Sequence, residues 1–199
     1  MARPSSFNRE DALESARNLF WRKGFHATSL KDIEAALSLR PGSIYAAFGS
    51  KKNLFAEALE YYTTGVEEEF RTYLARAETP ISGLIAYVRS ITLPRDRDLP
   101  SNACMIFKTA LELADDESDL KQLARNQLAC VTRLFIEAFE RARQSGEVPD
   151  TLDPRRAALK LQSGITGLRG MIESGLTQAD AINLNDDIIA EVERMRSQQ

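Results

Sequence analysis

The residues best suited to a specific interaction lie between Thr28 and Lys52, in the stretch TSLKDIEAALSLRPGSIYAAFGSKK. In its second half, Leu39, Ile44 and Phe48 are spaced to anchor one side of a short helix against a core. The other side then carries small or hydrogen-bonding residues, namely Arg40, Gly42, Ser43, Tyr45 and Ala47. Such an outer face suits the major groove of DNA, where side chains of these kinds read base edges.

Groups that can hold phosphates flank this short helix. Ser50 and Lys51 begin the next helix, whose free backbone N–H groups and ammonium can bind a phosphate. Thr28 and Ser29 offer hydroxyls and a second helix N-terminus for a neighbouring phosphate. An ordinary three-helix assembly with incidental surface polarity fits the same pattern, so these residues alone leave both interpretations open.

The elements that would position these groups are all helical. Asn8 can cap a helix over 9–23, a short helix follows Ser29, and Pro41 opens another that ends at Gly49. Further helices are expected at about 51–76, 80–93, 101–114, 117–145, 154–174 and 181–196. We therefore expect an all-α fold of about nine helices. A three-helix helix-turn-helix domain would cover 1–53, with its motif at about 29–48, and a larger effector-binding and dimerisation domain 54–199.

Charge is distributed unevenly along the chain. Residues 1–53 carry nine Lys and Arg against five Asp and Glu, a net +4, whereas the remainder carries 17 against 24, a net −7. A basic N-terminal quarter on an acidic body indicates that this quarter meets phosphate, although chance clustering on a solvated surface would look the same. The absence of a secretory signal or long apolar segment, together with two cysteines, predicts a cytoplasmic protein with no membrane partner.

Enzyme chemistry finds little support in the sequence. His26 is the single histidine, no His/Cys/Asp cluster has metal-ligand spacing, and no glycine-rich phosphate-binding loop is present. We therefore expect no catalytic residue, no metal and no cofactor.

The segment 8–55 resembles the N-terminal domain of the TetR/AcrR family of bacterial transcriptional repressors. The similarity lies in ALESARNLFWRKGFHATSLKDIEAAL, in RPGSIYAAFGSKKNLF, and in the pairing of Gly24-Phe25 with Thr28-Ser29. The resemblance implies that Thr28, Tyr45 and Lys51 contact phosphates. It also implies that Arg40, Pro41, Gly42, Ser43 and Ala47 approach bases or backbone in the groove. Many members carry His where Ala47 stands, so a polar contact at that position is missing here.

The resemblance also implies a homodimer that represses transcription from a palindromic operator and is released by a small-molecule effector. Its last two long helices would pair with those of the second subunit. Gly164, Gly167 and Gly170, with Leu168 beside them, independently indicate close approach of another helix, because glycine inside a helix costs roughly 1 kcal/mol. A flexible helix, or glycines that pack within one subunit, would explain the same spacing.

An effector pocket is expected in the helical body. The candidate lining residues are Tyr62, Phe70, Tyr87, Cys104, Phe107, Leu111, Phe135 and Met171. Aromatic residues at helical spacing also fit a plain core. Cys104, near the start of a helix that can lower a thiol pKa, is either a sensor of electrophiles or oxidants or a small buried residue. Two rival functions stay open: a helical module that acts through protein contacts, and a small-molecule enzyme in the body.

Overall fold

The computed structural model describes residues 8–93, 99–114 and 118–196 of the 199-residue chain. Within these ranges the chain forms nine helices and no strand, which confirms the all-α class. None of the helices in these ranges is long and apolar enough to cross a bilayer. The helices are α1 (Arg9–Lys23), α2 (Leu30–Leu37), α3 (Pro41–Phe48), α4 (Lys51–Arg76), α5 (Pro80–Ser90), α6 (Met105–Glu112), α7 (Ser118–Gln144), α8 (Pro154–Glu173) and α9 (Gln178–Glu193).

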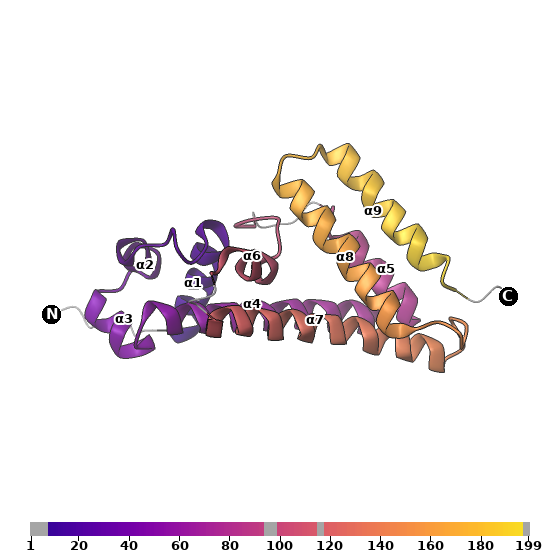
Figure 1. Cartoon of the computed structure of the whole chain (residues 1–199), viewed down its shortest axis with the longest axis horizontal. Helices are drawn as coiled ribbons and strands as arrows, with labels where there is room; N and C mark the ends of the chain where they lie inside the picture. Colours follow the sequence, from indigo (N-terminus) through magenta and orange to yellow (C-terminus); the bar gives the residue numbers. More distant parts are fainter. Residues whose placement is uncertain (1–7, 94–98, 115–117, 197–199) are drawn as a thin grey trace.

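The molecule is elongated, with a small head at one end (Figure 1). The head consists of α1, α2 and α3, and the body of α5 to α9. α4 and α7 run side by side along the molecule, α5, α8 and α9 form its other end, and α6 lies between the head and α8. The predicted boundary between residues 53 and 54 falls in the first turn of α4, which continues from the head into the body.

Local signals build the helix-turn-helix. The Ser29 hydroxyl accepts the N–H of Asp32 at 3.2 Å, and the Asp32 carboxylate accepts the N–H of Ser29 at 2.8 Å, a reciprocal cap that starts α2. Ser38 ends α2 in the left-handed conformation (φ 53°), and Pro41 occupies the first turn of α3. Gly49 then turns the chain towards α4 with φ 75°, a conformation that favours glycine.

Aromatic packing makes α4 part of two cores. In the head, Phe20 packs edge-on against Phe55 of α4, with ring centroids 4.9 Å apart. In the body, Phe70 of α4 packs edge-on against Tyr87 of α5 and Phe135 of α7, each at 5.1 Å. Because such buried rings resist separation, α4 connects the two regions mechanically.

The ends of three helices differ from the expectation, and α5 ends at Ser90 and not at 93. α6 begins at Met105 and not near residue 101, and Cys104 is its N-cap residue. α9 begins at Gln178 and not at 181, because the Thr177 hydroxyl accepts the N–H of Asp180 and caps the helix earlier.

Candidate nucleic-acid interface and effector cavity

α3 has a buried inner face and an exposed outer face. Ile44 and Phe48 are buried beneath it, as the sequence predicts, and Leu39 is half-buried in the preceding turn. Tyr45 is 50% exposed, and Ala47 is half-buried. The remaining predicted groove residues, all exposed, are Arg40, Pro41, Gly42 and Ser43. The outer face therefore gathers the side chains that sequence reasoning assigned to the groove.

Arg9, which the sequence-based prediction omits, holds α3 in place. Its Nη1 donates to the backbone carbonyl of Ala47 at 2.9 Å, and its guanidinium lies 4.6 Å from the centroid of the Phe48 ring. It also forms an ion pair with Glu57 of α4. A basic residue in the first turn of a helix interacts unfavourably with the helix dipole. The position of Arg9 in the sequence was therefore a signal that a tertiary contact holds this residue there.

The two lysines at the start of α4 have different partners. Lys51 Nζ lies 4.5 Å from the ring centroid of Phe25, beside the helix N-terminus that Ser50 caps. Lys52 Nζ pairs with Asp119 of α7 at 2.6 Å, and this hydrogen bond lowers the pKa of the Asp119 carboxyl. Lys51 is thus held on the head, and Lys52 is tied to the body.

Ser29 and Thr28 lie in different surroundings. Ser29 is exposed, and its hydroxyl donates to Asp32 at 2.7 Å. Hydrogen bonds from Lys23, at 2.7 Å, and from Ser29 hold the pKa of Asp32 well below its usual range. Thr28 is only 1% exposed, and its hydroxyl donates to the carbonyl of Gly24 at 2.6 Å. The expected phosphate contact through the Thr28 hydroxyl is therefore wrong for this conformation, because the side chain braces the loop from inside.

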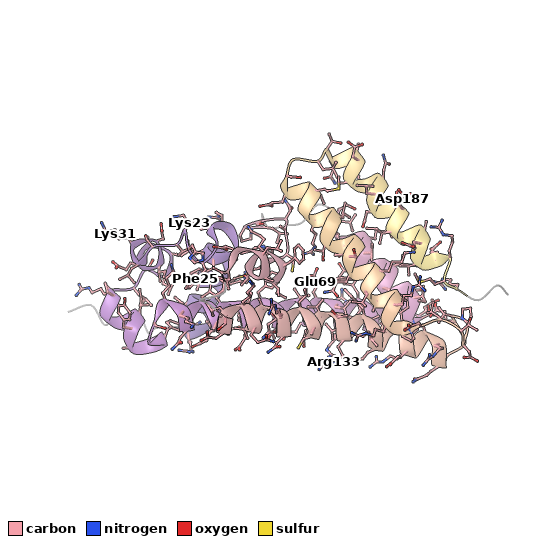
Figure 2. The ribbon with its side chains drawn as sticks, viewed as in Figure 1. Lys23, Phe25, Lys31, Glu69, Arg133 and Asp187 are labelled. Atoms are coloured by element: carbon pink, nitrogen blue, oxygen red, sulfur yellow. The ribbon has the colours of Figure 1, made fainter. Side chains whose placement is uncertain are left out.

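The basic quarter of the sequence forms one end of the molecule. Lys23 and Lys31, both exposed, lie on the head, whereas Asp187 lies on α9 at the far end (Figure 2). The uneven charge of the sequence therefore becomes a charge difference between the two ends of the fold.

A small cavity, called the inner cavity below, lies among α4, α5, α6, α7 and α8. It unites half of the predicted pocket residues: Tyr62, Tyr87, Cys104 and Phe135. Its wall on α8 is polar and includes Gln162, Thr166 and Arg169. The free space is about 30 Å³, enough for one or two water molecules.

The other predicted pocket residues lie elsewhere. Phe70 belongs to the core, where it packs on Tyr87 and Phe135. Phe107 and Met171 line an open groove of about 570 Å³ beside α8, which shares Leu128, Gln162 and Thr166 with the lining of the inner cavity. The assignment of Leu111 to a pocket is wrong, because this residue is 72% exposed on α6. Periodicity identified it as apolar but could not show which side of α6 meets the body.

Two buried polar groups meet at the inner cavity. Tyr62 is 5% exposed, and its hydroxyl has no hydrogen-bond partner among the described residues. Burial, together with neighbouring Cys104, raises the pKa of Tyr62 well above its ordinary value. Arg169 is 8% exposed. Burial alone lowers the pKa of Arg169, but surrounding acidic groups outweigh it and raise the pKa; these are Tyr87, Tyr62, Cys104 and Glu69.

The sequence contains a signal for Arg169 that the prediction did not use. Leu161, Ile165 and Arg169 follow one another at intervals of four and share the buried face of α8. Arginine is almost never fully buried without a partner group, so a charged residue at a core position points to a functional site.

The glycines of α8 do not share one face. A Cβ atom added to Gly164 would lie 3.3 Å from Ile188 of α9, so Gly164 packs within one subunit, and Leu168 is buried. Both residues therefore have contacts within one subunit, and their part in a dimer contact stays a prediction. Gly167 and Gly170 face open space and stay candidates for that contact. Each step of three residues rotates the position by about 60° around a helix, so three such glycines diverge.

α6 joins the inner cavity to the head. The Trp21 indole N–H donates to the carbonyl of Ala103 at 2.6 Å, and Lys108 Nζ donates to the carbonyl of Trp21 at 2.9 Å. At the other end of α6, the Glu112 carboxylate accepts the N–H of His26 at 3.1 Å. A displacement of α6 would therefore act on the C-terminal end of α1 and on the loop before α2.

Comparison with known families covers most of the chain. Residues 12–58 match the family described as "Bacterial regulatory proteins, tetR family". Residues 80–181 match the domain described as "Tetracyclin repressor-like, C-terminal domain".

Individual relatives agree with these matches. The HTH-type transcriptional repressor ComR of Escherichia coli is 27% identical over 168 residues, which cover 83% of this chain and 80% of ComR. The repressor BdcR of Escherichia coli is 37% identical over 86 residues, 43% of each chain. A cysteine mutant of the TetR family regulator CifR, solved with 26-bp double-strand operator DNA, superposes with a TM-score of 0.85 at 26% identity, covering 94% of this chain and 98% of CifR. The chain belongs to the TetR family of bacterial regulatory proteins.

Proposed function

We propose that this protein is a transcriptional repressor that binds a near-palindromic operator as a homodimer and leaves it when an effector binds or a thiol is modified. The observation that carries the proposal is the outer face of α3, which is exposed, uncharged except for Arg40, and anchored from below by Ile44 and Phe48. ComR and BdcR are named repressors, and CifR was solved on operator DNA, which supports the same role here. A protein that acts on bacterial DNA works in the cytoplasm.

In this proposal α3 enters the major groove. Arg40 reaches base edges or backbone at its N-terminal end, and Tyr45 and Lys51 bind phosphates on either side. Ser29 reaches a further phosphate only if its hydroxyl leaves Asp32. The family consists of regulatory proteins, which supports the expectation that the chain is not an enzyme.

The dimer would form through α8 and α9. Apolar side chains stay exposed on these helices, among them Leu159, Met171 and Ile182, and Gly167 and Gly170 lie on the open side of α8. A second copy would cover these side chains, and the two α3 helices could then read half-sites roughly 34–36 Å apart.

The effector would act from the inner cavity. α6 begins at the cavity with Cys104 and ends on the head at Glu112, and α4 is shared by both cores. An effector that fits one setting of these helices better would change the separation of the two α3 helices, with a coupling of about 1–3 kcal/mol. Modification of Cys104, the N-cap residue of α6, would disturb the same connection.

The test is direct binding to DNA. Fluorescence anisotropy should show nanomolar, salt-sensitive binding to a duplex taken from just upstream of the protein's own gene, and weaker binding to a scrambled duplex. Sedimentation of the protein at micromolar concentration should give a dimer. Equal affinity for both duplexes, or no affinity for either, would contradict the proposal and favour a module that acts through protein contacts.

A further inference from the structure

Arg169 is a buried cation that shares the inner cavity with hydroxyl and thiol groups. Tyr62, Tyr87 and Cys104 line the inner cavity with it, and Glu69 lines the neighbouring cleft. A guanidinium in such a setting attracts an anion strongly, because water does not screen it.

The Tyr62 hydroxyl provides a second, independent indication of a ligand. It is buried at the same cavity and lacks a hydrogen-bond partner among the described residues. A buried donor without an acceptor costs about 1–3 kcal/mol, and such a group in a native structure calls for a missing partner. An oxygen anion that accepts from both Tyr62 and Arg169 would satisfy this donor.

Much of the remaining lining is apolar, although Gln162 and Thr166 of α8 also face the cavity. Side chains from α4, α6, α7 and α8 enclose it, namely Val66, Ile106, Leu128, Val131, Phe135 and Ile165. A ligand with a charged oxygen group at one end and a compact hydrocarbon body at the other would match this arrangement, because each part meets groups of its own kind.

We propose that the effector of this protein is a small organic acid whose carboxylate binds Arg169 and the Tyr62 hydroxyl and whose apolar part packs in the inner cavity. Arginine is suited to this role, since its planar guanidinium can hold both oxygens of one carboxylate. The regulatory consequence of this proposal rests on the proposed function. Binding of the acid itself does not depend on that function.

The acid can enter beside α1. A cleft of about 230 Å³ shares Tyr62, Val66 and Arg169 with the inner cavity, and its outer wall includes Trp21 of α1. Because the inner cavity has room for only one or two waters, a bound acid must widen it or extend into this cleft. Trp21 is also the residue that bonds to the chain before α6 and to Lys108. Widening would therefore act on the connection between α6 and the head.

Isothermal titration calorimetry on the full-length wild-type protein without DNA tests the binding. The probes are benzoate and the straight-chain acids from acetate to octanoate, each compared with its own amide as a neutral isostere. At least one acid should bind more tightly than its amide, by about 10- to 100-fold, since a charged hydrogen-bonded pair is lost in the amide. If no acid is preferred over its amide, the proposal is refuted.

Variants then locate the site. Arg169→Gln should weaken binding of the preferred acid by about 10- to 100-fold, and Arg169→Lys by less. Arg156→Gln, an exposed arginine in the first turn of the same helix, should leave the affinity unchanged. Tyr62→Phe, which removes only the hydroxyl, should weaken binding several-fold and serves if Arg169→Gln does not fold. Unchanged affinity in Arg169→Gln, or in Tyr62→Phe if that variant must stand in, would overturn the assignment.

A final arm separates the two proposals. The preferred acid should lower the affinity of wild-type protein for the upstream duplex, and Arg169→Gln should resist this. If the protein binds the duplex but the acid does not release it, the acid is not the effector. If the protein binds no duplex, the proposed function fails while the acid-binding result stands on its own measurement.

Discussion

The salt dependence of DNA binding gives a sharp test, because Lys51 and Lys52 are adjacent yet have different partners. Lys51 lies on Phe25 at the start of α4, whereas Lys52 is paired with Asp119 at 2.6 Å. We expect Lys51→Ala to remove a phosphate contact and Lys52→Ala to remove a cation that already has a carboxylate partner. Both variants lose one positive charge per subunit, so each controls for the other.

The magnitude follows from counterion release. The slope of log K against log salt changes by about 0.9 for each phosphate neutralised, so losing Lys51 from both subunits should make the slope shallower by about 1.8. A fourfold rise in salt, from about 50 to 200 mM, lowers the affinity of both proteins for DNA. The factor by which the affinity falls should be about 12 times smaller for Lys51→Ala than for wild type. Lys51→Ala should weaken specific and scrambled duplexes alike, since a phosphate contact carries no sequence information.

Fluorescence anisotropy titrations at four salt concentrations measure the three slopes. Lys52→Ala should change the slope by clearly less than Lys51→Ala. The reasoning is refuted if Lys51→Ala leaves the slope unchanged, or if Lys52→Ala shifts it by as much.

Further predictions concern stability, assembly and sensing. Asp32→Asn should lower Tm at pH 7, and the difference in Tm from wild type should shrink below about pH 4. A carboxylate whose pKa is lowered in the folded state stabilises the fold above its unfolded pKa, and this stabilisation is lost as the pH falls through the folded pKa. A difference in Tm that does not change with pH would contradict this. Gly167→Ala should weaken the dimer in sedimentation, even though the same change in an open helix would stabilise the helix by up to about 1 kcal/mol. Gly164→Ala should instead disturb packing on α9 within the subunit. An undiminished dimer in Gly167→Ala would exclude Gly167 from the contact. Phe55→Ala should cost about 3–5 kcal/mol in denaturant unfolding, because Phe55 of α4 is fully buried against Phe20 of the head. Cys104→Ser should abolish release from DNA by electrophiles and oxidants; full release by all of them would remove the thiol from the mechanism.

Local sequence signals alone predict the helices of the head and the side of α3 that faces outward. These features depend on local chemistry: the Ser29 cap, the Pro41 start and the Gly49 turn act within a few residues of their own position. The anchors Ile44 and Phe48 were predictable for the same reason, since their spacing places them on one side of a short helix.

Long-range packing sets which polar and small residues are buried, and which residues they contact. Leu111 and Tyr62 both read as apolar pocket residues, yet one faces solvent and the other faces a cavity, because only the packing of α6 and α4 distinguishes them. Likewise Gly164 meets α9 while Gly167 faces open space, since rotation around the helix separates them. The meeting of Arg169 with Tyr62 joins residues more than a hundred positions apart in the chain. Periodicity within one helix cannot predict such a pair, because it arises from α4 and α8 both packing on α7.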